Sequence, residues 1–120
     1  MAGQLVHFEL PSRDSERAKG FWSGLFGWSF TDPGMPGIEY WMTRTGEHQG
    51  GAVLPVGDGS AGVIVYFESD DINASVARVR ECGGGSDDPS PIPHVGWFAR
   101  CTDTEGNSFR LFQSDESAGA

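Results

Sequence analysis

The chain has 120 residues, a length that suits one domain with one packed core. Its 17 acidic and 8 basic residues give a net charge of −9, which argues against binding to nucleic acid or to an anionic membrane. No apolar run approaches the roughly 20 residues of a membrane span, no signal-peptide pattern is visible, and two cysteines are too few for a disulfide scaffold. We therefore expect a soluble, cytoplasmic protein.

The first half of the chain predicts a strand, a helix and further short strands. Eighteen glycines and 12% aromatic residues favour strands and tight turns over a helix bundle. Residues 4–10 alternate as a strand does. Ser12 or Asp14 caps a helix that Gly27 ends. Its apolar positions follow helical spacing and are Ala18, Phe21, Trp22, Leu25 and Phe26. Short strands are expected at 28–31, 39–44 and 51–56, with a turn at 32–37 and a flexible break at 57–62.

The second half repeats this plan. Residues 63–68 predict a strand, the pair Asp70–Asp71 begins a helix, and the glycines at 83–85 end it. The remaining expectations are a short strand at 86–88, a stiff proline-rich connector at 89–93, strands at 95–102 and 108–113, and a frayed polar tail at 115–120.

The two halves are related by a constant offset. The helix signals from Ser12 to Gly27 recur from Ser69 to Gly84, 57 positions later, so each half reads β-α-β-β-β, over residues 4–57 and 61–114. Two modules that each expose one sheet face would pair to enclose a core. We expect a single α+β domain in which two βαβββ modules pair into a cup-shaped, mostly antiparallel eight-stranded sheet, with one helix packed on each module.

Several short motifs carry a resemblance to a known superfamily. They are VHFEL at 6–10, ERAK at 16–19, FW at 21–22, LFGW at 25–28, CGG at 82–84, GWFA at 96–99 and DTEGNSF at 103–109. Over residues 4–114 the chain resembles the vicinal oxygen chelate superfamily, the glyoxalase and bleomycin-resistance proteins. Thr104 departs from the proline usual in the closing turn. The motifs describe packing and turns, so they identify the fold better than the chemistry.

The resemblance also implies where a metal would bind. Metal-using members line the cup with four His, Glu or Gln ligands. Carried over to this chain, those positions fall on His7, on Ile64 at the module offset, on Arg110 in the last strand, and on Gly51 or Ala52. Isoleucine has no lone pair to donate, and arginine repels a divalent cation. We therefore expect no metal and no other cofactor, with a relocated divalent metal as the alternative.

Strand alternation sorts the other residues into two faces. If His7 and Ile64 face the cup, residues two positions away on each strand face it too. The cup-facing set is Leu5, His7, Glu9, Ile64, Tyr66, Glu68, Arg110 and Phe112. The opposite faces and the helices predict a buried set of Val6, Phe8, Phe21, Leu25, Val65, Phe67, Val76, Val79, Phe109 and Leu111. A cup lined in this way suits a small, partly aromatic organic molecule.

Within this cup His7, Tyr66 and Glu68 are candidate catalytic residues, and each has a structural alternative as a hydrogen-bonded, packing or ion-paired side chain. Arg110 either anchors a carboxylate or pairs with a neighbouring glutamate. The candidates for ligand binding are Glu9, Ile64, Arg110, Phe112, Trp97 and His94. Trp97 is alternatively a core residue, and His94 is alternatively an exposed loop residue.

Three functions stay open at this point. The first is a metal-independent protein of bleomycin-resistance type that binds an aromatic or carboxylate-bearing small molecule. The second is an enzyme, either a metal-free acid–base catalyst or a lyase, isomerase or dioxygenase with a relocated metal. The third is a partner module with a vestigial cup. We expect a homodimer, because an open cup with sheet edges invites pairing.

Overall fold

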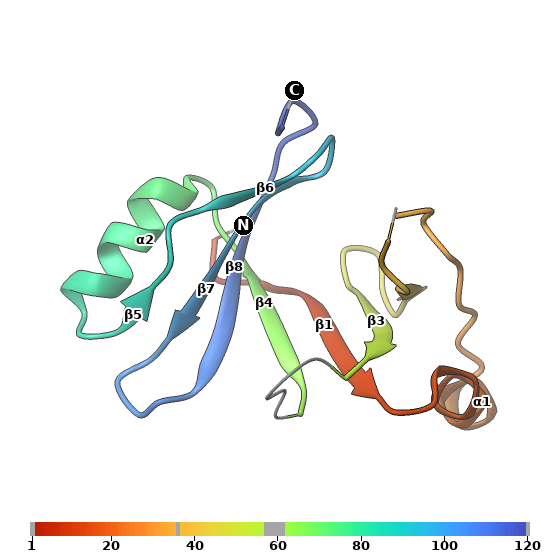
Figure 1. Ribbon diagram of the computed structural model, residues 1–120. Helices are drawn as coiled ribbons and strands as arrows, with labels where there is room; N and C mark the ends of the chain where they lie inside the picture. The colour runs from red at the N-terminus through yellow and green to blue at the C-terminus, as the bar shows by residue number, and fades with distance from the viewer. Residues whose placement is uncertain (1, 36, 57–61, 120) are drawn as a thin grey trace. The chain divides into compact units, whose positions relative to one another are not determined.

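A computed structural model gives the structure of the protein and describes residues 2–35, 37–56 and 62–119. These residues form two helices and eight strands (Figure 1): β1 (Leu5–Ser12), α1 (Ser15–Phe26), β2 (Trp41–Arg44), β3 (Gly50–Pro55), β4 (Ile64–Glu68), α2 (Ile72–Glu81), β5 (Gly85–Ser86), β6 (Ser90–Ile92), β7 (Gly96–Thr102) and β8 (Ser108–Ser114). The expected α+β class is confirmed. The break expected at 57–62 lies outside the described residues except for Gly62. Neither described helix is long and apolar enough to cross a membrane.

The chain divides into two compact units, which we call the first and second modules. The first module is Val6–Ile64, and the second is Val65–Ala120 together with the N-terminal residues as far as Leu5. Backbone hydrogen bonds tie that N-terminal segment to β4: the Gly3 amide donates to the Glu68 carbonyl at 2.8 Å, and the Glu68 amide donates to the Gln4 carbonyl at 2.8 Å.

The two helices begin in the same way, at the offset that the sequence predicts. Asp14 caps α1 with its carboxylate accepting from the Arg17 amide at 3.0 Å, and Asp71 caps α2 with its carboxylate accepting from the Ala74 amide at 3.2 Å. The backbone angles of the caps are φ −145°, ψ 98° and φ −146°, ψ 98°. Each cap satisfies an amide that the first helical turn leaves without a partner. Gly27, at φ 73°, ends α1 as expected.

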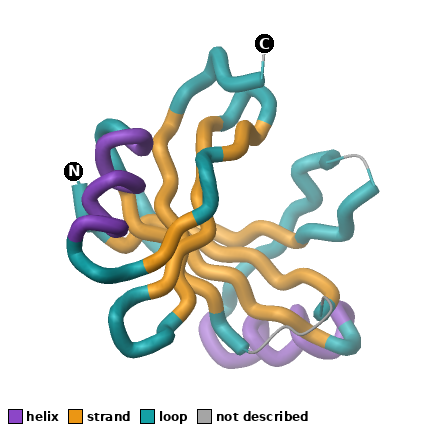
Figure 2. The backbone as a smooth tube through the Cα atoms, turned by 60° about the vertical axis from the view of Figure 1, so that its left-hand side comes forward, coloured by secondary structure: helices purple, strands orange, loops and turns teal. Residues whose placement is uncertain are grey.

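In the first module β3 lies between β1, which is parallel to it, and β2, which is antiparallel. Helix α1 packs against β3 (Figure 1). The strand expected at 28–31 is reduced to a single bridge between Thr31 and Met42, and the chain from α1 to β2 is otherwise loop where it is described (Figure 2). A bridge forms there because the Thr31 and Met42 amides each donate to the other's carbonyl at 2.8 Å.

In the second module β8 lies between parallel β4 and antiparallel β7. Both β5 and β6 pair with the other edge of β7, and α2 packs against β5, β7 and β8 (Figure 1). The core between helix and strands is apolar and consists of Ile72, Val76, Ala99, Cys101 and Leu111. It confirms the predicted inward set of β8 and α2.

The proline-rich segment 89–93 differs from the expected connector. Residues Ser90–Ile92 form the strand β6, in which Pro91 lies opposite Trp97. Proline has no amide hydrogen to donate, and an edge strand tolerates it because one side of the strand needs no partner. The short strand expected at 86–88 is found at Gly85–Ser86.

The burial prediction was wrong for helix α1. Phe21 is 59% exposed and Leu25 is 55% exposed, and no residue of α1 is fully buried. The helix turns Ala18 and Trp22, which are half-buried, toward its module. Phe21 and Leu25 are four positions apart and therefore share one stripe of the helix. The other eight members of the predicted set are buried or half-buried.

The C-terminal residues differ from the expected frayed tail. The Asp115 amide donates to the Val95 carbonyl at 3.0 Å, and the His94 amide donates to the Ala118 carbonyl at 2.9 Å. Ala118 is 1% exposed. Residues 115–119 thus form a turn held against the connection between β6 and β7. The polar composition that suggested fraying supplies the hydrogen bonds of this turn.

Candidate functional site

The register of β1 on β3 separates the two faces of the first module. His7 lies opposite Gly50 and Glu9 opposite Ala52, and parallel partners present their side chains to one face. Phe8 points to the other face, where a Cβ at Gly51 would overlap its ring. There the Phe8 ring also contacts Trp28 at 5.9 Å between centroids. The alternation predicted for the first strand is confirmed.

A chain of hydrogen bonds links three side chains on the His7 face. His7 Nε2 lies 2.6 Å from the Tyr40 hydroxyl, and the Tyr40 hydroxyl donates to Glu9 Oε2 at 2.9 Å. Because the single Tyr40 proton goes to Glu9, the Tyr40 oxygen must accept from His7. The His7 proton therefore sits on Nε2, and a neutral His7 carries its lone pair on Nδ1. We call this set the His7–Tyr40–Glu9 chain.

The surroundings of the His7–Tyr40–Glu9 chain favour a neutral His7 imidazole. Burial lowers the pKa of His7 below 6.5, and the nearby Glu9 carboxylate opposes this by raising it. Glu9 itself is 7% exposed, and its carboxylate is stabilised by the Tyr40 hydroxyl. The His7–Tyr40–Glu9 chain therefore places the neutral base His7 near the buried carboxylate of Glu9, with the Tyr40 hydroxyl between them.

A second cluster lies on the strands of the second module. Tyr66 is opposite Arg110 in the pairing of β4 with β8, and it is 6% exposed. Arg110 Nη1 donates to the Tyr66 hydroxyl at 2.7 Å. The guanidinium also lies over the rings of Tyr66, at 5.5 Å, and Phe98, at 5.8 Å. These contacts fix a permanent positive charge on a mostly aromatic surface.

The register extends this surface along β7 and β8. Phe98 lies opposite Phe112, and Arg100 lies opposite Arg110. The Arg100 guanidinium lies over the Phe98 ring at 5.1 Å. Arg100 and Arg110 thus share one face of the strand pair, each with an aromatic ring beneath its charge. Such a face suits a planar anion or an aromatic carboxylate.

Three further predicted residues lie on the same strands. Glu68 is opposite Phe112 in the β4–β8 pairing, and both side chains are half-buried. Ile64 is half-buried at the start of β4. On these strands the structure agrees with the face assigned by alternation.

Trp97 and His94 do not join this cluster. Trp97 alternates with Phe98 and packs against the core beneath α2, and its indole nitrogen donates to Asp115 Oδ2 at 3.0 Å. It therefore lies on the face opposite to Arg110, which corrects its assignment as a ligand platform. His94 is exposed in the turn between β6 and β7 with φ at 63°. That turn adjoins Gly96, whereas Arg110 pairs with Arg100, about 13 Å further along β7.

Comparison with known proteins decides the family. A family model for a glyoxalase-like domain matches residues 6–112. A glyoxylase-like domain-containing protein of Didymella fabae is 36% identical over 118 residues, which cover 91% of this chain and 92% of that protein. This chain belongs to the glyoxalase-like domain family. A putative glyoxylase, CFP32, of Mycobacterium bovis is 31% identical over 93% of the chain, which spans 46% of that protein's length.

Solved structures show the same glyoxalase-like fold. A substituted methylmalonyl-CoA epimerase of Streptomyces coelicolor in complex with 2-nitronate-propionyl-CoA superposes with a TM-score of 0.75 at 17% identity and covers 100% of both chains. A methylmalonyl-CoA epimerase in complex with methylmalonyl-CoA and NH4+ gives 0.75 at 18% identity, covering 98% of this chain and 99% of that one. The resemblance to the vicinal oxygen chelate superfamily is confirmed.

The residues at the family's metal positions do not fit a divalent cation. Ile64 offers no donor atom and Arg110 brings a positive charge, while β3 presents Gly50 and Ala52 beside His7 and Glu9. Gly51, the other residue assigned to that position, faces Phe8 instead. Within residues 2–35, 37–56 and 62–119, no group of three or more His, Cys, Asp or Glu side chains is placed to hold a metal ion.

Tyr40 is the site residue that sequence reasoning missed. It precedes β2, in which Met42 lies opposite Ala52, and Ala52 lies opposite Glu9. Two positions before Met42 in an extended segment, Tyr40 shares the face of Glu9. Strand alternation placed only Tyr66 of the two tyrosines in the chain. Tyr40 could have been placed only from the pairing of β2 with β3.

Proposed function

We propose that this glyoxalase-like protein binds a small organic molecule with a carbonyl or carboxylate group and an aromatic or apolar body, without a metal. The observation that carries the proposal is the His7–Tyr40–Glu9 chain, in which a base that burial keeps neutral is joined to a buried carboxylate. In metal-using relatives the first of these positions serves a metal. Here its ring nitrogen is already committed to a tyrosine hydroxyl.

Arg110 supports the other half of the proposal. Its guanidinium supplies a fixed positive charge at a position where relatives carry a metal ligand, and Tyr66 holds it at 2.7 Å. A carboxylate or enolate oxygen would accept hydrogen bonds from this guanidinium. We propose each cluster as a ligand contact of its own module, with Glu9 beside His7 in the first module and Glu68 and Phe112 beside Arg110 in the second.

The test is a titration with phenylpyruvate, an aromatic 2-oxo acid with two adjacent oxygens. Arg110→Met should weaken binding at least tenfold, because a charge-assisted pair is lost. The matched control is Arg78→Met, which removes an exposed arginine of α2 whose side chain is 73% accessible. If both variants bind as the wild type does, the assignment of Arg110 as the anion anchor is wrong.

A second candidate function is metal-free acid–base catalysis of isomerase type. The observation that favours it is the lone pair on Nδ1 of a neutral His7, with Tyr40 and Glu9 able to stabilise the imidazolium that would form. In this reaction Nδ1 removes a proton from the carbon next to a carbonyl, and the carbon–hydrogen electron pair becomes an enolate. The imidazolium then returns the proton, and the enolate electron pair forms the carbon–hydrogen bond again.

Deuterium exchange tests this candidate. Methylmalonyl-CoA, the ligand named for one structural relative, is incubated with the protein in D2O, and incorporation at the acidic carbon is followed by mass spectrometry. Catalysed exchange that His7→Gln abolishes would support an enzyme. If methylmalonyl-CoA binds but exchanges deuterium no faster than in buffer alone, the protein binds that class of compound without catalysing the reaction.

We also infer a cytoplasmic homodimer. The strands β2, β5 and β6 each have an edge without a partner strand among the described residues, and such edges are places where a second chain can pair. Sedimentation velocity at two concentrations measures this directly. A single monomer boundary at high concentration would contradict it.

A further inference from the structure

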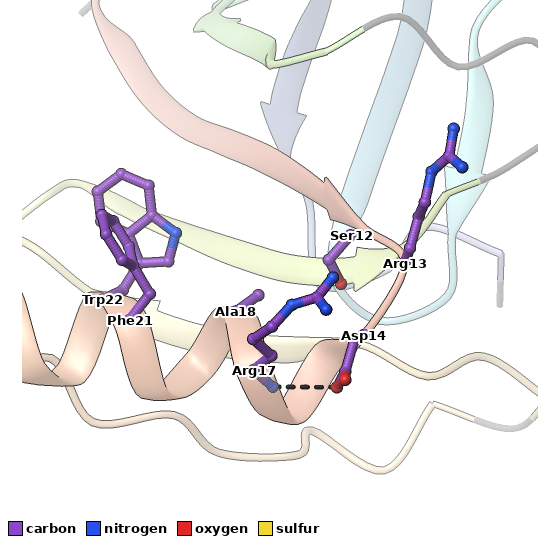
Figure 3. Close-up of a pocket in the computed structure, with 7 residues that line it drawn as sticks. All are labelled: Ser12, Arg13, Asp14, Arg17, Ala18, Phe21 and Trp22. Carbon is purple, nitrogen blue, oxygen red and sulfur yellow. Dashed lines mark hydrogen bonds between the residues drawn. The ribbon is translucent and has the colours of Figure 1, made fainter.

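A pocket at the start of α1 shares no residue with the two clusters described above. It has a volume of about 420 Å³, and the residues that line it are Ser12, Arg13, Asp14, Arg17, Ala18, Phe21 and Trp22 (Figure 3). Small-molecule sites in proteins have volumes of roughly 300 to 1,000 Å³. All of these residues belong to the first module and lie within eleven consecutive positions.

The polar end of the pocket is positively charged. Among the described residues, neither Arg13 nor Arg17 forms an ion pair, and both side chains are exposed. The carboxylate of Asp14 lines the pocket too, but it accepts from the Arg17 amide at 3.0 Å as the cap of α1 (Figure 3). The two guanidinium groups outnumber the one carboxylate, which is already hydrogen-bonded. The pocket is therefore positively charged, although the whole chain has a net charge of −9.

The other end of the pocket is an aromatic wall that its own contacts hold in place. Trp22 stacks on Trp28 with 5.2 Å between centroids and 12° between planes, and it stacks on Phe26 at 6.1 Å. Phe21 meets Trp22 edge-on at 5.1 Å and 90°. Although Phe21 is 59% exposed, this contact restrains its ring. Leu25, 55% exposed and one turn further, extends the apolar stripe.

The positions of these groups define a ligand with two ends. Within α1, Arg17, Phe21 and Leu25 follow one another at intervals of four, so positive charge passes into apolar surface along one stripe of the helix. From Arg17 to Leu25 this stripe is about 12 Å long. Its charged end suits a carboxylate, sulfonate or phosphate, and its apolar end suits a ring or a short chain.

We propose that this pocket binds a small free organic anion with an aromatic or aliphatic body, at a site separate from the His7–Tyr40–Glu9 chain. The guanidinium group of Arg17 binds the anionic group, Arg13 adds positive charge at the same end, and Phe21 and Trp22 contact the body. A molecule rather than a membrane is the occupant, because a chain with a net charge of −9 is repelled by an anionic bilayer.

The first experiment maps binding of 4-phenylbutyrate by amide chemical shifts on the whole chain. Saturable shifts at residues 12–26, with a dissociation constant of about 1 mM or lower, are expected. 4-Phenyl-1-butanol, which lacks the charge, and inorganic phosphate, which lacks the body, should each bind at least tenfold more weakly. Shifts that gather at His7, Glu9 and Tyr40 instead, or none that saturate, would overturn the proposal. A failure of the phenylpyruvate titration would leave this result unaffected, because no residue is shared.

Two pairs of variants identify the groups responsible. Arg17→Gln should weaken 4-phenylbutyrate binding at least tenfold, whereas Arg78→Gln, an exposed arginine of the other helix, should leave it unchanged. Phe21→Ser should weaken it similarly, whereas Ile38→Ser, which removes a side chain that is 53% exposed, should not. Arg17→Gln should keep the wild-type melting temperature, because its guanidinium is not a core group. Phe21→Ser loses the edge contact with Trp22 and should melt at a lower temperature while staying folded. Equal effects of test and control variants would contradict the proposal.

Two further experiments test whether the surface around the pocket instead contacts a membrane or a second copy of the protein. Sedimentation with vesicles of phosphatidylglycerol and phosphatidylcholine should leave the protein in the supernatant. If Arg17→Gln abolishes vesicle binding that the wild type shows, the surface is a membrane contact and the proposal is wrong. If Phe21→Ser converts a dimer to a monomer while 4-phenylbutyrate fails to bind, the surface is a subunit contact and the proposal is equally wrong.

Discussion

His7 and Tyr40 are 33 positions apart in the chain, yet His7 Nε2 lies 2.6 Å from the Tyr40 hydroxyl. The rings also stack, with 6.1 Å between centroids and 19° between planes. Because the hydroxyl donates onward to Glu9, this contact sets the tautomer of the histidine. The relationship depends on β3, which positions β1 on one side and β2 on the other.

Tyr40→Phe should lower the free energy of unfolding by about 1–3 kcal/mol, because it leaves the buried Glu9 carboxylate without the hydroxyl that stabilises it. Urea denaturation measures this. Glu9→Gln in the Tyr40→Phe background should be less destabilising than Glu9→Gln alone, since the two residues interact. Additive effects in this cycle would show that the Tyr40–Glu9 hydrogen bond contributes nothing to stability.

Stability should depend on pH through His7. Burial lowers its pKa below 6.5 in the folded state, so the unfolded chain binds the proton more readily than the native chain. The contribution of His7 to the free energy of unfolding is therefore complete above pH 6.5 and falls as the pH drops below it. Urea denaturation between pH 5 and 7.5 should show a shallower pH dependence in His7→Gln than in the wild type.

The matched control for this pH dependence is His48→Gln, which removes an exposed histidine from a turn. An NMR titration of the His7 ring gives the pKa itself. A midpoint at or above 6.5 would contradict the effect ascribed to burial.

A pair of glycine variants tests the packing beneath β3. Gly51→Ala should destabilise the protein by about 1–3 kcal/mol, because the new methyl group would overlap the Phe8 ring, which rests against Trp28. Gly20→Ala should instead stabilise it by about 0.5–1 kcal/mol, because this helical position has open space around the new Cβ. A melting temperature for Gly51→Ala at or above the wild-type value would show that the Phe8 contact is not tight.

Much of the fold could be predicted because its signals are local. The caps Asp14 and Asp71, the stop at Gly27 and the period of the strands depend on residues close in sequence. The alternation of β8 likewise placed Leu111 in the core and Arg110 on the other face. The helix offset followed from the same local signals.

The rest depended on pairings that one sequence does not display. Tyr40 joins the site only through the register of β2 on β3. Pro91 belongs to a strand because β7 has an edge to offer, which no local pattern reveals. The exposure of Phe21 and Leu25 was missed because helical spacing identifies an apolar stripe but not whether another element covers it.

The central claim, that the ligand is bound without a metal, is tested most directly by titrating metal-stripped protein with phenylpyruvate. The protein is dialysed against EDTA, its Zn, Ni, Mn and Fe content is measured, and binding is followed by calorimetry before and after each metal is restored. We predict the same dissociation constant in the stripped and restored samples, and a loss of at least tenfold in Arg110→Met under both conditions. Binding that appears only after one equivalent of a divalent metal is restored would contradict this account.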